Sequence, residues 1–144
     1  MHHRDTSLDV TTAVRFHPGE VLLSALVRAL LILVFAMPLS SVLVFEALLL
    51  LATTFHHSNL ALGPKTEAWL SRVIVMPGIH WVHHHDRQAD TDSNYASILS
   101  VWDHLFGSRS PTQRTPDMTL GVEGADELPL ARLAVLPFEP RSGR

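Results

Sequence analysis

The sequence predicts an all-α integral membrane protein, built from a helical hairpin and a histidine-rich helical cap. Two observations carry this prediction. Residues 21–55 form an almost continuous apolar stretch in which Arg28 and Glu46 are the charged residues. The ten histidines all lie outside that stretch. An apolar stretch of this kind suits a bilayer, whereas grouped imidazoles at its ends suit a metal site.

The apolar stretch divides into two helices at Met37-Pro38, because proline can begin a helix but cannot continue one. Each half has about 16 residues, slightly fewer than the ~20 that cross a bilayer comfortably. Either half alone would therefore also suit the core of a soluble protein. Two halves in tandem favour a hairpin that enters and leaves the membrane on one side. A signal peptide does not fit, because the first twenty residues are polar and the apolar run is double.

The hairpin predicts which residues lie at equal depth. Arg28 and Glu46 are equally far from a turn near residue 37, so we expect them to pair, since an unpaired charge in the membrane is costly. His17 and His57 are also equidistant from the turn, and we expect them side by side where both helices leave the lipid. Arginines and Lys65 lie on that same side, which the positive-inside rule makes cytoplasmic.

Short helices are predicted beyond the hairpin. Residues 56–62 form its polar exit. Residues 64–75 place apolar side chains at helical spacing, which predicts an amphipathic helix on the membrane surface. A second short helix is predicted over residues 95–106, where Gly107 ends it.

These elements define the expected domains. A domain over residues 1–108 contains the membrane hairpin at about 21–55 and a histidine cap at 56–108. Residues 109–144 form a proline-punctuated C-terminal tail, in which "LARLAVLPF" has the composition of a packed segment.

The histidines are the candidate chemical groups. The chain has no cysteine, which excludes disulfides, thiolate metal sites and a cysteine nucleophile, and its net charge of -3 indicates no nucleic-acid partner. In "HWVHHH", His80, His83 and His84 occupy one face of a helix, so three ring nitrogens can point to one position. Imidazole binds iron, zinc, copper and nickel, and the spacing does not choose among them. A solvated histidine-rich loop is the alternative.

Three motifs occur in a fixed order. "RFHPGE" has the form R-x-H-P-x-E, "FHHSNL" is similar to F-x-H-A-N, and "HWVHHHDRQADTDSNYASILSVWDHLFGS" contains H-x-x-H-H followed by N-Y and a close match to W-D-x-L-F-G-T. In this combination the sequence resembles the fatty acid hydroxylase and sterol desaturase superfamily. The resemblance covers most of the chain. Trp81 stands where that family often has arginine.

The resemblance implies a membrane di-iron oxygenase, with a four-helix membrane core beneath a cytoplasmic cap of histidines. Such an enzyme uses O2 and an electron-donor protein to hydroxylate or desaturate a C–H bond of a membrane lipid, which requires a metal-bound oxidant. Asp92 and Asn94 would orient imidazole N–H groups, or would cap helices. By carry-over, the implied metal ligands are His2, His3, His17, His57, His80, His83 and His84.

The start of the chain departs from the family pattern. His2 and His3 match the closing pair of a middle histidine box, whereas the opening histidine of that box, the first box and two membrane helices have no counterpart. We therefore expect a misplaced start at Met1 and an inactive 144-residue chain. A zinc-dependent membrane hydrolase is the alternative enzyme, although H-E-x-x-H is lacking. The non-enzyme alternative is an inactive membrane fragment.

Overall fold

The structure, a computed structural model, describes residues 2–122, 124 and 128–138. Within these residues the chain is helical and contains no β-strand, so the predicted all-α class is confirmed. Met1, on which the expected start error rests, lies outside the described residues. The elements run in the order η1 (His2–Arg4), η2 (Thr12–Val14), α1 (Pro18–Val34), α2 (Leu39–His56), α3 (Pro64–Leu70), α4 (Pro77–His83), α5 (Gln88–Thr91), α6 (Val101–Leu105), α7 (Leu130–Val135) and η3 (Leu136–Phe138).

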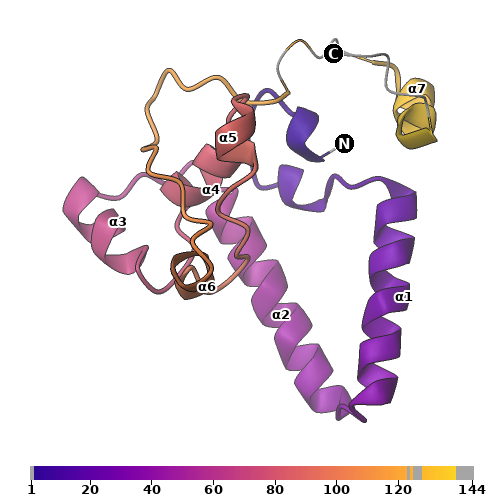
Figure 1. Ribbon diagram of the computed structural model, residues 1–144. Helices are drawn as coiled ribbons and strands as arrows, with labels where there is room; N and C mark the ends of the chain where they lie inside the picture. The colour runs from indigo at the N-terminus through magenta and orange to yellow at the C-terminus, as the bar shows by residue number, and fades with distance from the viewer. Residues whose placement is uncertain (1, 123, 125–127, 139–144) are drawn as a thin grey trace.

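The two longest helices form the predicted helix–turn–helix. Pro38 precedes α2 as its N-cap, so the two helices are separated at the predicted position. Ala36 has a positive φ of 47°, which reverses the chain at the turn. From this turn α1 and α2 diverge as a V rather than packing along their length (Figure 1).

Both helices expose their apolar side chains. Leu33 in α1 is 78% exposed and Leu51 in α2 is 67% exposed. Soluble proteins rarely expose contiguous apolar surface of this extent. Among the described residues, α2 alone has the length and composition of a membrane span, while α1 has 17 residues. A membrane-embedded hairpin therefore stays a prediction, which the exposed leucines support.

The predicted ion pair within the hairpin is present. Arg28 Nη1 donates to Glu46 Oε1, and Arg28 Nη2 donates to Ser24 Oγ at 3.2 Å. The pair joins α1 to α2 across the V. It gives each charge a partner, which is what a low-dielectric surrounding requires.

The cap packs at the C-terminal end of α2. Helix α4 contacts α2, and α5 contacts α4. A small apolar core forms around α4, from Met76, Ile79 and Val82, with Leu120 contributed by the tail. This core fixes α4, the helix that carries the histidine box, against the end of α2.

The two predicted cap helices are shorter than expected. α3 ends at Leu70, and Val75 N–H donates to Ile98 O instead of continuing the helix. α6 begins only at Val101, because the Asp103 carboxylate accepts the backbone N–H groups of Tyr95 and Ala96. A buried carboxylate thus holds residues 95 and 96 in a loop, a long-range effect that helical periodicity does not report.

The first part of the tail belongs to the cap. Residues His85 and Leu120 form an isolated antiparallel bridge, and Gly121 N–H donates to His84 O at 3.1 Å. Arg114 lies 3.6 Å from the centroid of the Trp81 ring and donates to Asn59 Oδ1 at 2.6 Å. Part of "LARLAVLPF" forms α7, but its described side chains are exposed or half-buried rather than packed as its composition indicated. The tail therefore covers α4 before it reaches α7.

Candidate metal centre

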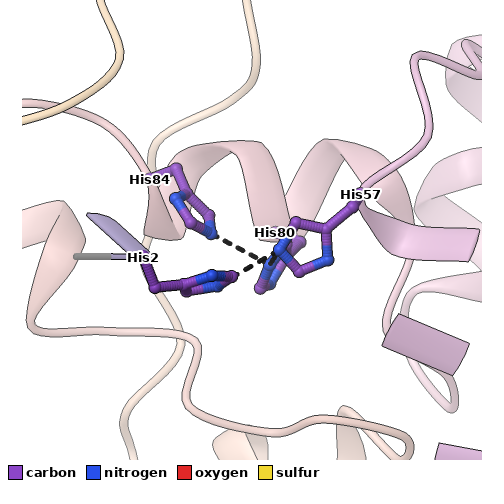
Figure 2. A group of neighbouring side chains, drawn as sticks. All are labelled: His2, His57, His80 and His84. Atoms are coloured by element: carbon purple, nitrogen blue, oxygen red, sulfur yellow. Dashed lines mark hydrogen bonds between the residues drawn. The ribbon is translucent and has the colours of Figure 1, made fainter. Parts of the chain in front are cut away.

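Four histidines from three elements meet at one position. His2 comes from η1, His57 is the C-cap of α2, His80 lies in α4 and His84 is the C-cap of α4. Each offers one ring nitrogen, and these four atoms lie within 4.8 Å of one another. Figure 2 shows the four imidazoles converging on a common point. We call them the four-histidine group.

The start of α4 sets the direction of two of these side chains. Pro77 begins the helix, and the Glu67 carboxylate accepts the Gly78 N–H at 2.7 Å, which satisfies a free amide of the first turn. A Cβ at position 78 would lie 2.3 Å from Glu67 Oε1, so glycine allows this close approach. His80 and His84 then follow one turn apart on the face toward α2.

Backbone carbonyls fix the proton position on two of the rings. His2 Nδ1–H donates to Thr12 O at 2.9 Å, and His57 Nδ1–H donates to Thr53 O at 2.7 Å. A carbonyl oxygen can only accept, so Nδ1 carries the proton in each neutral ring. The Nε2 atom of each ring therefore has a free lone pair, as in metal-binding histidines whose other nitrogen is held by the protein.

The two free lone pairs face each other. His2 Nε2 and His57 Nε2 are 3.2 Å apart, and neither has a proton to donate when both rings are neutral. The contact is repulsive unless a cation lies between the two atoms. The cation is either a proton, which would make one ring an imidazolium, or a metal ion.

Burial argues against the proton. Burial in the cap, together with the adjacent His57, lowers the pKa of His2 to about 4. Burial likewise lowers the pKa of His57 and of His80, whose imidazole also lies beside other histidines. These rings are thus neutral near pH 7, and a metal ion would satisfy the facing lone pairs.

The distances between the ring nitrogens also fit a metal ion. His80 Nε2 is 3.1 Å from His57 Nε2 and 3.1 Å from His84 Nε2. With a metal–nitrogen bond of ~2.1 Å, two ligand nitrogens stand about 3.0 Å apart at a right angle and about 3.4 Å apart at a tetrahedral angle. The observed spacings lie between these values. The donor set therefore fits a divalent first-row metal.

Three further histidines surround the group. The His3 ring stacks on His84, with centroids 4.5 Å apart, and lies 4.6 Å from His83. The His56 ring lies 3.9 Å from His80. His83 Nδ1–H donates to Ser93 O at 2.6 Å, which leaves its Nε2 free. The Nδ1 atoms of His3 and His56 are buried and have no hydrogen-bond partner among the described residues.

A cavity of about 400 Å³ opens beside these rings. Its walls include Glu20 from the first turn of α1, Thr53 from α2 and Tyr95 from the loop before α6. His2, His3, His57, His80 and His83 line it as well. The cavity therefore connects the polar ends of the V to the histidines.

His17 lies apart from the four-histidine group. Its Nδ1 accepts the Gly19 N–H at 3.0 Å, as the N-cap of α1, and its Nε2–H donates to Ala134 O at 2.9 Å. His17 does not lie beside His57 as expected, because α1 and α2 diverge from their turn (Figure 1). His17 as a ligand stays a prediction.

The two predicted orienting residues are placed differently from each other. Asp92 is exposed, and its carboxylate accepts from Gln88 Nε2 at 2.7 Å rather than from an imidazole. Asn94 is buried with a positive φ of 50°; its Oδ1 accepts the Ser110 N–H at 3.1 Å. Asn94 Nδ2 approaches Ile79 O at 3.4 Å, next to His80. Asn94 thus positions the backbone of the cap.

Sequence reasoning missed the backbone carbonyls and Asp103. Thr12, Thr53 and Ser93 orient imidazoles through main-chain oxygens, which any residue type supplies, so no letter of the sequence marks them. Asp103 is buried and accepts from Tyr95 N–H, Ala96 N–H and Ser108 Oγ. The sequence signal that could have identified Asp103 is its position in the motif "WDHLFG".

The extra histidine after the box has a structural role. His85 Nδ1 lies 2.8 Å from Asp90 Oδ2, away from the four-histidine group. Burial of Asp90 favours its protonated form, but hydrogen bonds from Thr112, His85 and Ser110 outweigh burial and keep its pKa below the ordinary value. Asp90 therefore stays ionised and ties α5 to the tail.

Comparison with models of protein families identifies the family of the chain. Residues 1–108 match the family model described as fatty acid hydroxylase. The match ends directly after the "LFGS" segment and includes every histidine of the centre. No solved structure matches the chain.

Proposed function

The chain belongs to the fatty acid hydroxylase family, and on that basis we propose that it is an iron- and O2-dependent oxygenase that hydroxylates or desaturates a membrane lipid. The family and the four-histidine group together indicate a metal-dependent lipid hydroxylase. Beyond this, we propose that the metal is iron, that a second metal position exists, that O2 is the oxidant and that the substrate is a membrane lipid.

One observation carries the proposal. The Nε2 lone pairs of His2 and His57 face each other at 3.2 Å, and both Nδ1 protons are held by carbonyls. Neutral imidazoles in this arrangement need a metal ion between them. His80 and His84 add two nitrogens at the same position. The His3 and His83 rings lie beside His84, which supports a second iron.

Bound iron would supply the activation of O2 and the oxidant that an unactivated C–H bond requires. The chain holds the imidazoles neutral by burial and orients them through Thr12, Thr53 and Ser93. The cavity beside the rings reaches α1 at Glu20 and α2 at Thr53. A lipid chain lying between the two helices would thus meet the histidines at its polar end.

We further propose that α1 and α2 lie in the bilayer and that the histidine centre faces the cytoplasm. The exposed leucines of both helices and the paired Arg28 and Glu46 support the first part. The positions of the basic residues support the second part. A separate electron-donor protein would reduce the metal from that side.

Metal analysis of the purified chain tests the site without requiring turnover. We expect iron in the wild-type protein and loss of most of it in His57→Ala. His104→Ala is the matched control, since His104 is exposed and lies outside the group, and it should retain the metal. Equal metal content in both variants would contradict the assignment.

The identity of the metal separates the alternatives. Zinc without iron, lost in His57→Ala, would favour the zinc-dependent hydrolase. No bound metal would favour an inactive fragment.

A further inference from the structure

Aromatic side chains on the cap form an exposed surface that the metal centre does not use. Trp69 in α3 is 67% exposed, and Trp102 and Phe106 at α6 are 51% and 76% exposed. The Trp102 and Phe106 rings stack with centroids 6.3 Å apart. Leu105 beside them is also exposed. We call Trp69, Trp102, Leu105 and Phe106 the aromatic platform.

The two helices of the platform are fixed to each other. Ser71 directly follows α3, and its carbonyl accepts from Ser100 Oγ at 2.8 Å and from Arg109 Nη1 at 2.9 Å. Ser100 is the N-cap of α6. Ser71 and Ser100 are both buried. The platform is therefore one rigid part of the cap rather than a set of independent loop side chains.

Helix α6, which carries most of the platform, lies on the side of the cap toward the hairpin turn. In Figure 1, α6 lies lower than α4 and α5, in the direction of the α1–α2 turn and at the height of the C-terminal half of α2. The C-terminal half of α2 exposes Leu50 and Leu51. The exposed aromatic side chains of α6 and the exposed leucines of α2 thus belong to segments at a similar height in this view.

The composition of the platform selects one occupant. Tryptophan concentrates at the boundary between lipid headgroups and acyl chains, where its ring is apolar and its N–H remains hydrated. Lys65 and Arg72, at the two ends of the α3 segment, are exposed and carry the charge that anionic headgroups attract.

We propose that the aromatic platform inserts into the headgroup–acyl boundary of the leaflet from which α2 emerges. The side chains would enter this boundary by roughly 5 to 10 Å, as interfacial helices do. The platform then fixes the height of the histidine centre above the acyl chains. This inference rests on the proposed membrane placement of the hairpin and adds a second, shallow contact to it.

The three tryptophans provide the test, because Trp81 is an internal control. Its indole N–H is buried and Arg114 covers its ring, so it lies inside the cap. Three variants of the full chain, each keeping one tryptophan and carrying phenylalanine at the other two positions, are reconstituted into anionic liposomes. Bromine is placed either high on the acyl chains or near their ends, and fluorescence is compared with unbrominated lipid.

We expect the variants that keep Trp69 or Trp102 to lose fluorescence with the shallow bromine, and less with the deep bromine. The variant that keeps Trp81 should lose little with either. Flotation of each variant with the liposomes reports the hairpin separately, and retained metal reports an intact cap. Membrane placement can therefore fail without being confused with failure of the platform.

Three results would overturn the proposal in a variant that floats and retains metal. Unquenched emission at long wavelength would place Trp69 and Trp102 in water. Unquenched emission at short wavelength would mean that a second copy or another protein segment covers the platform. Stronger quenching by the deep bromine would place it among the acyl chains rather than at the boundary.

Discussion

Substituting Glu46 by glutamine tests whether the hairpin depends on its internal ion pair. Arg28 Nη1 donates to Glu46 Oε1 across the V, and Arg28 Nη2 donates to Ser24 Oγ. Glutamine keeps the shape and one oxygen acceptor but removes the negative charge. The variant therefore leaves Arg28 as a cation without a counter-charge on an apolar helix.

The position of Arg28 sets the size of the effect. It lies ten residues after Pro18, the first residue of α1, which corresponds to about 15 Å along the helix. Its side chain cannot carry the guanidinium that far to the surface. Insertion scales assign about 2.5 to 3.5 kcal/mol to an arginine at this depth. Because Ser24 and the new amide oxygen retain hydrogen bonds, we expect Glu46→Gln to cost about 2 kcal/mol.

Reversible unfolding of the full chain in lipid bicelles measures this cost. The matched control is the double variant Arg28→Gln/Glu46→Gln, which has no charge inside the hairpin and should recover most of the lost stability. The coupling energy of the double-mutant cycle then isolates the pair. A Glu46→Gln variant within about 0.5 kcal/mol of wild type, or a double variant that loses the sum of both single losses, would refute the reasoning.

Three further predictions follow from other contacts. Asp103→Asn should cost roughly 1.5 to 3 kcal/mol in chemical unfolding, because an amide N–H₂ would face backbone donors that the carboxylate now accepts; stability equal to wild type would exclude this role. Gly78→Ala should displace the Glu67 carboxylate and cost about 1 to 2 kcal/mol, more than Glu67→Gln, which keeps an acceptor for the Gly78 N–H; the reverse order would contradict the close approach. Acid should destabilise the metal-free chain, because histidines with an ordinary pKa of 6.5 take up protons on unfolding, whereas burial holds the pKa of His2 at about 4 and of His3 at about 3. Thermal unfolding after chelation should show the loss beginning as the pH falls below 6.5, at roughly 1.4 kcal/mol per pH unit for each such histidine; a pH-independent midpoint would contradict the neutral cluster.

The hairpin was predictable because its causes are local. Pro38 can only start a helix, and the apolar residues on either side leave no polar interruption, so the break and both helices follow from the chain itself. The pairing of Arg28 with Glu46 followed from counting residues to the turn. By contrast, the same count placed His17 beside His57, and the structure separates them. Counting fixes depth along a helix but not the angle between two helices.

The helix boundaries of the cap were less predictable because distant groups decide them. Residues 95 and 96 have a helical pattern, yet their amides bond to the carboxylate of Asp103. The segment after Leu70 donates to Ile98 instead of continuing α3. In both segments a local helix competes with a hydrogen bond that forms only when the cap has folded. Burial strengthens the hydrogen bond to the distant residue.

The sequence by itself determined the all-α class and the family, because helix period, proline position and motif order are properties of neighbouring residues. Only the tertiary structure decided which histidines meet. His2, His57 and His80 come from three separate elements, and carbonyl oxygens of Thr12 and Thr53 turn two of their lone pairs toward each other. Those carbonyls belong to the main chain, which is the same at every residue. Their position in space, which only the fold sets, orients the imidazoles of the candidate metal centre.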